Sequence, residues 1–366
     1  MAEHILTLRE LNRAMLARQM LLERASVSTL DALKRLVGLQ AQIPKPPYIG
    51  LWTRLLSFQH DDLTQLLEDK QAVRATMMRS TLHLMATEDY MLLRPALQPA
   101  LTRALHGFFS KGAKSVNVEQ FTSTMQAYIQ EQPRTFVEMR AKLTELFPDT
   151  DPALMAYIVR THLPLVQISP GGTWSFTGSP AHAIAETWLG RSFANSSESL
   201  RHLILRYLAA FGPATVKDIQ AWSGLIRLQS MIEALKPELC TFQDELGNQL
   251  YDLPDTPRPS ADVPAPLRFI PEFDNLVLSY ADRQRIVRNE YRPLFIVPPG
   301  RVLATFLVDG FVRGTWKTER RQNVAHLIIT PFESLSNDVR NGLVKEGQRL
   351  LHFVEDDAER YEVQFL

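Results

Sequence analysis

Two glutamines, Gln40 and Gln42, flank a single alanine and could act together on one substrate. The apolar periodicity predicts an amphipathic helix over residues 28–39, and the prolines at positions 44, 46 and 47 forbid its continuation. In the extended chain expected beyond that helix, residues two apart point the same way, roughly 7 Å from each other. Each amide offers a carbonyl acceptor and an NH2 donor, so the pair could orient water and polarise a bond. The alternative is that both glutamines only cap the helix end.

The composition bounds the kind of protein. The 366 residues are 45% hydrophobic, which is ample for packed cores and predicts two or three domains or a set of small modules. The single cysteine, Cys240, excludes an internal disulfide and a cysteine-rich zinc site. The N-terminus lacks the apolar core of a signal peptide, and no apolar run reaches membrane-spanning length. We therefore expect a soluble, cytoplasmic protein.

The charge balance limits any interaction with nucleic acid to a local surface. Because 40 basic residues meet 40 acidic ones, the chain has no overall attraction for a polyanion. Two short basic clusters are candidates for a DNA-binding face: Arg283, Arg285 and Arg288, and Lys317, Arg320 and Arg321. Each cluster could equally be an ordinary solvated surface.

The elements that must position the glutamines are modular. From residue 199 the pattern reads helix, helix, turn, helix and hairpin, which is the order of a winged helix. The expected helices span residues 199–210, 216–222 and 225–235, with a hairpin tip at 245–248. The middle of the chain repeats this order, with helices at 119–130, 136–146 and 152–162 and strands at 165–169 and 173–177. A looser version near the N-terminus has helices at 6–22 and 28–39 and a strand pair within 73–85.

The last hundred residues follow a different pattern. Strands are expected at 301–308, 311–317 and 323–329, with the favoured hairpin turn Asp309-Gly310 between the first two. Residues 348–356 and 358–364 could be helix end or strand, and the proline-rich linker 254–266 marks a boundary. We predict an α+β fold of three tandem winged-helix modules and a C-terminal antiparallel β-rich domain. The predicted domains are residues 1–115, 116–185, 186–255 and 256–366.

Several fragments resemble one protein family in the same order along the chain. They are Gln40-Ala41-Gln42, Arg79-Ser80-Thr81-Leu82-His83, Pro271 to Asn275 with Asp282-Arg283, and Val308-Asp309-Gly310 through Thr315-Trp316. Together they resemble the AlkZ/YcaQ superfamily of bacterial winged-helix DNA glycosylases, and the Gln–apolar–Gln type within it. The resemblance implies that Gln40 and Gln42 are catalytic and that double-stranded DNA is the substrate, within the nucleoid.

The chemistry of glutamine restricts the substrate that such a site could take. Breaking an ordinary N-glycosidic bond needs protonation of the leaving group and stabilisation of an oxocarbenium-like sugar. An amide can only hydrogen-bond and polarise, which is sufficient if the base already leaves easily. Purines alkylated at N7 or N3 are cationic and leave without protonation. We therefore expect a hydrolase for such alkylpurines, including bulky adducts and interstrand crosslinks reached through an open channel.

Other side chains are candidates for DNA binding. His83 could contact the sugar or phosphate, or could be structural. Asp274, beside Asn275, could supply a carboxylate, or could merely form a turn. Arg283 and Arg313 could contact phosphates; Asp282 and Arg283 could instead form an ion pair, and the Asp309-Gly310 hairpin could insert in a groove or form a sheet edge. The remaining expectations are that Trp316 is in the core and that Lys45 is solvated, so that the enzyme lacks lyase activity.

Two alternatives remain open at this stage. A non-catalytic winged-helix DNA-binding regulator would need a base-reading third helix, yet residues 225–235 offer only Arg227 and Gln229 for that role. A structural adaptor would use its winged helices to bind proteins. No metal and no cofactor are expected, because the sequence has neither metal-ligand spacing nor a nucleotide-binding loop, and a monomer is the default.

Overall fold

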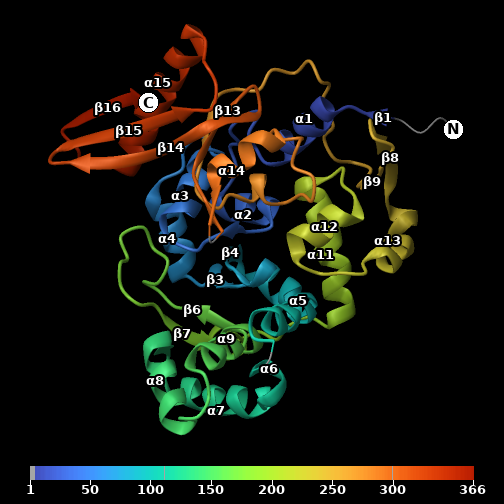
Figure 1. Cartoon of the computed structure of the whole chain (residues 1–366), viewed down its shortest axis with the longest axis vertical. Helices are drawn as coiled ribbons and strands as arrows, with labels where there is room; N and C mark the ends of the chain where they lie inside the picture. Colours follow the sequence, from blue (N-terminus) through green and yellow to red (C-terminus); the bar gives the residue numbers. More distant parts are fainter. Residues whose placement is uncertain (1–4, 111, 299) are drawn as a thin grey trace.

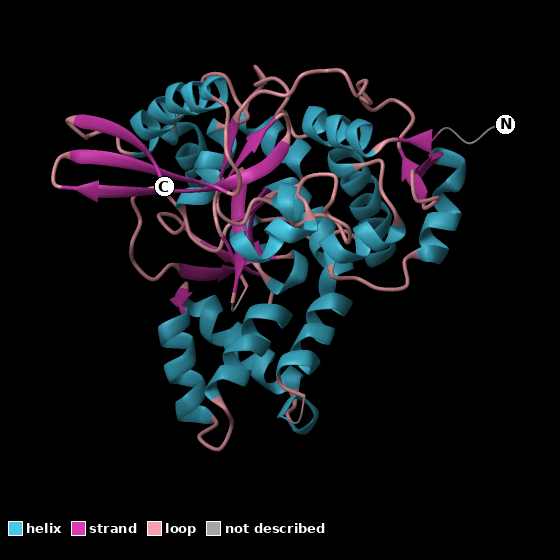
Figure 2. Ribbon diagram, turned by 45° about the horizontal axis from the view of Figure 1, so that its top comes forward, coloured by secondary structure: helices cyan, strands magenta, loops and turns pink. Residues whose placement is uncertain are grey.

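The structure is a computed structural model that describes residues 5–110, 112–298 and 300–366. It is a mixed α+β protein, as predicted, in which helices surround several separate sheets (Figures 1 and 2). The first four residues of the predicted first domain lie outside these ranges. Within the described ranges, no helix combines the length and apolar character needed to cross a membrane.

The segment before the glutamines ends its helix earlier than expected. Helix α1 (Leu8–Arg18) begins at a capping box, and α2 (Thr29–Leu36) begins at the N-cap Ser28. Helix α2 ends at Leu36 because the next two residues are left-handed, Val37 with φ 52° and Gly38 with φ +84°. A Cβ at Gly38 would lie 2.6 Å from Met85 Cγ, so glycine is required there. The chain then enters the short strand β2 (Leu39–Gln40).

The prolines after the glutamines do not keep the chain extended. Helix α3 (Lys45–Trp52) starts there, with Pro46 and Pro47 in its first turn. Proline lacks an N–H and has φ near that of a helix, so it is tolerated at the start of a helix although it cannot sit inside one. The extended backbone that the sequence predicted beyond Leu39 is therefore short. Helix α4 (His60–Glu68) follows α3.

The glutamine segment is the edge of a six-stranded sheet of order β2-β4-β3-β6-β7-β5. Strands β3 (Ala72–Thr76) and β4 (Leu82–Ala86) form the strand pair predicted within residues 73–85. The other strands are β5 (Arg134–Thr135), β6 (Leu165–Gln167) and β7 (Ala181–Ile184). The sheet thus joins strands from the predicted first and second domains. The strand predicted at 173–177 is wrong, because the second strand of that hairpin is β7 and residues 168–180 form turns and irregular chain.

The helices of the middle region gather below this sheet, at the bottom of Figure 1. They are α7 (Val118–Glu131), α8 (Phe136–Leu146) and α9 (Pro152–His162), and the last two have the predicted bounds. Their core contains Phe121, Met125 and Ile158. The region is entered through the long helix α5 (Thr87–Phe108) and the short helix α6 (Gly112–Ser115), and it ends at α10 (Ala185–Leu189).

The third region follows the predicted order. Its helices are α11 (Ser196–Phe211), α12 (Val216–Ser223) and α13 (Gln229–Leu235), and its hairpin strands are β8 (Cys240–Asp244) and β9 (Gln249–Asp252). Helix α13 starts four residues later than expected. The N-terminal strand β1 (Ile5–Leu6) adds to this hairpin in parallel with β8.

The C-terminal region contains a five-stranded sheet of order β10-β13-β14-β15-β16, seen at the upper left of Figure 1. The strands are β10 (Arg268–Ile270), β13 (Thr305–Val308), β14 (Phe311–Arg321), β15 (Val324–Pro331) and β16 (Arg360–Phe365). The sheet is not wholly antiparallel, because β16 pairs in parallel with β15 after the helix α15 (Asn337–Val354). Between β10 and β13 the chain forms the short elements α14 (Arg292–Phe295), β11 (Ile296–Val297) and β12 (Arg301–Val302).

Buried ion pairs fasten the N-terminal helices to the later regions. Arg18 donates to both oxygens of Asp252, at 2.7 and 2.8 Å, and Arg24 pairs with Glu346 on α15. The linker 254–266 is held against α1, where Arg13 donates to the carbonyl of Val263 at 2.6 Å. A buried charge that has lost its partner is costly, so these pairs fix the relative positions of the regions.

Candidate active site at the glutamine pair

The side-chain oxygen of Gln40 accepts a hydrogen bond from one arginine. Gln40 lies on a strand that pairs with β4, opposite His83, and its side chain is 7% exposed. Arg79 Nη2 donates to Gln40 Oε1 at 2.9 Å. The same guanidinium donates to the Trp222 carbonyl at 2.6 Å and to Asn275 Oδ1 at 3.1 Å. Arg79 therefore links the glutamine to α12 and to the loop after β10.

Gln42 is exposed and contacts the same turn. The backbone N–H of Leu82 donates to Gln42 Oε1 at 2.9 Å, and Ala41 N donates to the Leu82 carbonyl at 2.7 Å. Ala41 is fully buried in the core between the two glutamines. Both glutamines thus bind the short stretch from Arg79 to Leu82, as a shared site requires.

A second arginine fixes the backbone of the motif. Arg74 on β3 donates from Nε to the Ala41 carbonyl at 2.7 Å and from Nη2 to the Gln42 carbonyl at 3.1 Å. Its Nη1 donates to Gln167 Oε1 on β6 at 2.6 Å. Burial lowers the pKa of Arg74 to about 10, which still leaves it charged at neutral pH. The carbonyls on either side of Gln42 are therefore tied to the six-stranded sheet.

The turn that carries Arg79 is conformationally unusual. It is a 3-10 turn, η1 (Met78–Ser80), in which Arg79 has φ 56° and Ser80 has φ 58°. Two successive non-glycine residues in the left-handed region cost free energy, and such strain is concentrated at functional sites. Gly224 packs against it, since a Cβ there would lie 3.6 Å from Arg79 Cα. The turn is thus held in place by its surroundings.

The loop after β10 supports the site from the C-terminal region. Asn275 is 2% exposed, accepts from Arg79 and donates from Nδ2 to the Gly38 carbonyl at 3.1 Å. Asp274 is buried and accepts from Arg54 through both oxygens at 2.9 Å. In this structure neither side chain has a surface to offer to DNA, and Asp274 is not a free carboxylate for catalysis.

His83 is also interior. It is fully buried, its Nδ1 lies 3.1 Å from the Thr81 carbonyl, and its Nε2 has no hydrogen-bond partner. Burial, and then the nearby Arg79 charge, lower its pKa to about 3, so the ring is neutral at physiological pH. A neutral buried ring does not attract a phosphate, so His83 is placed as a structural neighbour of the turn and not as the expected DNA contact.

The remaining candidates differ in what surrounds them. Arg283 is part-exposed, and its buried Nε has no hydrogen-bond partner. Burial, and then the Arg292 charge, lower its pKa to about 10. The expected ion pair with Asp282 does not form, because Asp282 accepts from Gln284 N and Nε2. Arg313 is paired with Glu333 at 2.5 Å.

The Asp309-Gly310 turn does not project into solvent. Asp309 pairs with Arg9 and Arg13 of α1, and a Cβ at Gly310 would lie 2.5 Å from Leu16 Cδ1. The turn is docked on α1, which favours the sheet-edge alternative over insertion in a DNA groove. Trp316 is in the core as predicted, 7% exposed, with Nε1 donating to the carbonyls of Ile270 and Thr305.

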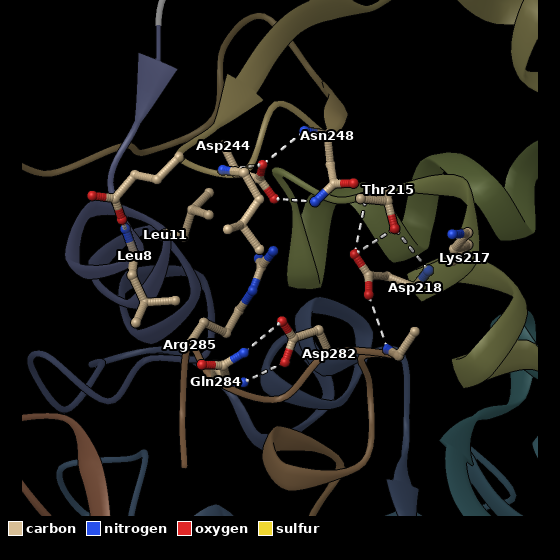
Figure 3. A pocket seen from close by; sticks show the side chains of 13 residues that line it. Leu8, Leu11, Thr215, Lys217, Asp218, Asp244, Asn248, Asp282, Gln284 and Arg285 are labelled. Atoms are coloured by element: carbon tan, nitrogen blue, oxygen red, sulfur yellow. Dashed lines mark hydrogen bonds between the residues drawn. The ribbon is translucent and has the colours of Figure 1, made fainter. Parts of the chain in front are cut away.

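A cavity of about 350 Å³ lies away from the glutamines, between the start of α12, the β8–β9 turn and residues 281–285 (Figure 3). Its carboxylates already accept hydrogen bonds: Asp218 from Thr215 and Ala281, and Asp244 from Asn248. These polar groups hold turns together. Within the described ranges, no three His, Cys, Asp or Glu side chains are grouped so that they could hold a metal ion. We therefore place the candidate chemistry at the glutamines.

Two of the residues that organise the site were not singled out from sequence. Arg79 belongs to the quoted fragment Arg79 to His83, so a signal existed, although the functional role was given to His83. Arg74 carried no signal, because an isolated arginine in an apolar strand is not distinctive. Its role is visible only once β6 and the Ala41–Gln42 backbone are placed beside it.

Comparisons with known proteins concern the chain as a whole. The family model described as "DNA glycosylase AlkZ-like" matches residues 33–353. The chain is 23% identical over 348 residues to an "Interstrand DNA cross-link repair glycosylase" of Streptomyces sahachiroi, covering 86% of this chain and 88% of that protein. The solved structure of the Streptomyces sahachiroi DNA glycosylase AlkZ superimposes with a TM-score of 0.79 at 19% identity, covering 99% of this chain and 100% of that one. The structural likeness shows a shared fold.

Proposed function

The chain belongs to the AlkZ-like DNA glycosylase family, and from that premise we propose that it hydrolyses the N-glycosidic bond of cationic purines alkylated at N7 or N3 in double-stranded DNA. The substrates include bulky adducts and interstrand crosslinks. The biological role is DNA repair or self-resistance to alkylating agents. One observation carries the proposal. The side chains of Gln40 and Gln42 both accept hydrogen bonds from the turn Arg79–Leu82, whereas the carboxylate of Asp274 is paired with Arg54.

A site of amides suits a leaving group that needs no proton. The C1′–N9 bond of an N7-alkylpurine breaks with its electron pair going to the base, which departs neutral and leaves an oxocarbenium-like sugar. Water then adds at C1′ and its proton is lost to solvent. Gln40 and Gln42 act by orienting polar groups at this centre, and one correctly placed hydrogen-bond donor is worth about 10²–10³ in rate.

The exposure of Gln42 supports substrates larger than a single flipped base. A crosslinked purine is tethered to both strands and cannot travel far into a closed pocket. Here Gln42 is solvent-exposed and the adjacent Ile43 is 45% exposed. The name of the Streptomyces relative, an interstrand DNA cross-link repair glycosylase, supports the same inference.

We also propose three winged-helix modules as the scaffold. The third region has helix, helix, helix, hairpin, and the middle region has helix, strand, helix, helix, strand, strand. Both orders are those of a winged helix. Of the predicted DNA contacts, Arg283 remains the strongest, because it lacks a carboxylate partner among the described residues. His83, Asp274, Asn275 and Arg313 act at most through neighbouring groups.

A monomeric, cytoplasmic enzyme without lyase activity completes the proposal. Strand cleavage would require an amine that forms a Schiff base with the sugar. Lys45 is exposed, and its Nζ lies over the ring of Trp174, 4.7 Å from the ring centroid. We therefore expect an intact abasic strand as the product.

The direct test is base release from duplexes that carry a single N7-methylguanine or an N7–N7 crosslink, assayed with EDTA present. Wild type should release both bases without cutting the strand. Gln40→Ala combined with Gln42→Ala should lose at least about 10²-fold of the rate, with DNA binding retained. Absence of release by the wild type, together with tight binding of undamaged DNA, would instead favour the regulator.

A further inference from the structure

The hydrogen bonds at the site fix which end of each amide faces the substrate. Arginine has donors and no acceptor, so the group that faces Arg79 must be the carbonyl oxygen of Gln40. The NH2 group of that amide is therefore directed away from Arg79. This assignment rests on the chemistry of the partner, not on telling nitrogen from oxygen by shape.

The same reasoning applies to Gln42. A backbone N–H can only donate, so Leu82 N also requires the carbonyl oxygen of its partner. Within the described ranges, neither Gln40 Nε2 nor Gln42 Nε2 has a hydrogen-bond partner, and neither is among the fully buried unpartnered atoms. Both amides thus turn their oxygens toward the protein and keep their donors free.

We propose that the site works as a pair of N–H donors, which Arg79 and the Leu82 N–H align toward a lone pair at the reacting centre. This inference rests on the proposed function and specifies how the same site acts. It differs from holding the sugar cation with amide carbonyls, because those oxygens face Arg79 and the Leu82 N–H. Arg79 is a positioning residue, since it acts through Gln40.

The positive charge behind Gln40 strengthens its donor. A guanidinium bound to an amide oxygen withdraws electron density from the amide, and linked hydrogen bonds polarise one another. Burial, and then the Arg283 charge, lower the pKa of Arg79 to about 10, so it stays protonated at neutral pH. The donor is therefore aligned and polarised before substrate arrives.

The acceptor that gains most from such donors is on the departing base. As the C1′–N9 bond breaks, its electron pair neutralises the cationic purine and raises the electron density at the ring nitrogens. In an N7-alkylpurine the N3 lone pair, on the far side of C4 from N9, can accept an N–H bond that strengthens as the charge develops, which is the condition for catalysis. The oxygen of the attacking water can also accept such a bond and be positioned by it, but that bond weakens as the water lone pair attacks C1′.

Isosteric variants separate a donor role from an acceptor role. Gln40→Glu and Gln42→Glu keep an oxygen for Arg79 or Leu82 N but replace the free NH2 by oxygen, while Gln40→Met and Gln42→Met remove both polar ends. We expect the Glu and Met variants to lose a similar factor, about 10²–10³, in single-turnover release of N7-methylguanine. Glu variants that match or exceed wild type would overturn the inference, because only an acceptor role survives that change.

The position of Arg79 is tested by a double-mutant cycle. If Arg79 acts through Gln40, then Arg79→Met should cost little more in a Gln40→Met background, and the effect should fall on kcat and not on KM. Arg79→Lys should recover part of the rate, because an ammonium can also donate to Gln40 Oε1. If the effects of Arg79→Met and Gln40→Met were fully additive, and Arg79→Met left kcat unchanged, Arg79 would have a purely structural role. That result would overturn its part of the inference.

Substrate analogues identify the acceptor. With 3-deaza-7-methylguanine the N3 lone pair is absent, so the Gln→Met losses should largely disappear if N3 is the acceptor and persist if water is. Failure of wild type to release N7-methylguanine would overturn the proposed function and this inference with it. Release by wild type and by the Glu variants would overturn this inference alone.

Discussion

At the glutamine pair, the two amide side chains are oriented by groups that can only donate hydrogen bonds. Gln40 faces a guanidinium and Gln42 a backbone N–H, so their orientations follow from the chemistry of their partners. The strained left-handed turn at Arg79 and Ser80 is the device that brings both donors to the motif. Strain there is consistent with a site that must be preorganised.

The buried histidine beside this turn makes stability depend on pH. The pKa of His83 is lowered to about 3, whereas an unfolded histidine has a pKa near 6.5. Between about pH 6.5 and pH 3 the unfolded chain binds a proton on this ring and the folded chain does not. The contribution of His83 to the free energy of unfolding is therefore complete above about pH 6.5 and is lost as the pH falls toward 3. The slope from one such histidine is at most about 1.4 kcal/mol per pH unit.

Urea unfolding at several pH values checks this prediction. Between pH 6 and 4.5, His83→Asn should show a shallower loss of unfolding free energy than wild type. His182, whose pKa is lowered to about 4 by burial, should leave a residual slope in that variant. Parallel slopes in wild type and His83→Asn would mean that His83 is not the neutral buried ring described here.

The observed helices agree with those predicted from the sequence wherever local capping residues determine where a helix begins. Helix α8 begins at the capping box of Thr135 and Glu138, and α9 begins at Asp151 followed by proline, so both have the bounds that the sequence predicts. The prediction for residues 168–180 was wrong because their structure depends on contacts with residues far away in the sequence. Trp174 there stacks on His60 at a centroid distance of 4.2 Å, and it also lies beside Phe353 of α15.

The candidate site residues could be predicted unevenly for the same reason. Gln40 and Gln42 stand in one tripeptide, so the sequence itself marks them as candidates. The role of Arg79 depends on partners 39, 143 and 196 residues away along the chain. No local pattern encodes contacts of that separation. The Asp309-Gly310 turn was correctly predicted as a turn, yet its burial against α1 could not be read from the dipeptide.

The docking of that turn on α1 can be tested with two glycines. Gly310→Ala should lower the free energy of unfolding by about 1–2 kcal/mol, because alanine is strained at the positive φ of this position. The close contacts of the new Cβ with Leu16 and Asn12 should lower it by about 1–3 kcal/mol more. Gly247→Ala is the matched control, because Gly247 has φ +78° and no atom within 4 Å of its added Cβ. Thermal unfolding should separate the two variants, and equal losses would contradict a docked turn.

Among the described residues, the buried apolar side chains form several cores, and the core of the middle region is separate from the most extended one. The extended core joins residues from α1, α11, α12 and the C-terminal strands, including Leu16, Phe211 and Leu307. The middle core joins α7, α8 and α9 and includes Phe121 and Met125. Figure 1 shows these three helices at the bottom of the molecule, beneath β6 and β7. The middle region should therefore open without unfolding the site.

Hydrogen exchange of two matched variants checks this independence. Phe121→Ala and Phe211→Ala each empty a buried phenylalanine site, at a cost of about 3–5 kcal/mol. Phe121→Ala should accelerate exchange in residues 118–162 and leave 196–223 protected, and Phe211→Ala should do the reverse. Uniform acceleration throughout the chain in both variants would show a single cooperative core.

We propose that paired amides suffice at this site because the substrate base is cationic. The most direct measurement compares single-turnover release of N7-methylguanine and of hypoxanthine, a neutral lesion base, from otherwise identical duplexes. We predict release of N7-methylguanine at a rate that Gln40→Ala and Gln42→Ala each lower by about 10²–10³, and no release of hypoxanthine. Comparable release of both bases by the wild type would contradict the claim, because a neutral purine requires an acid that two glutamines cannot provide.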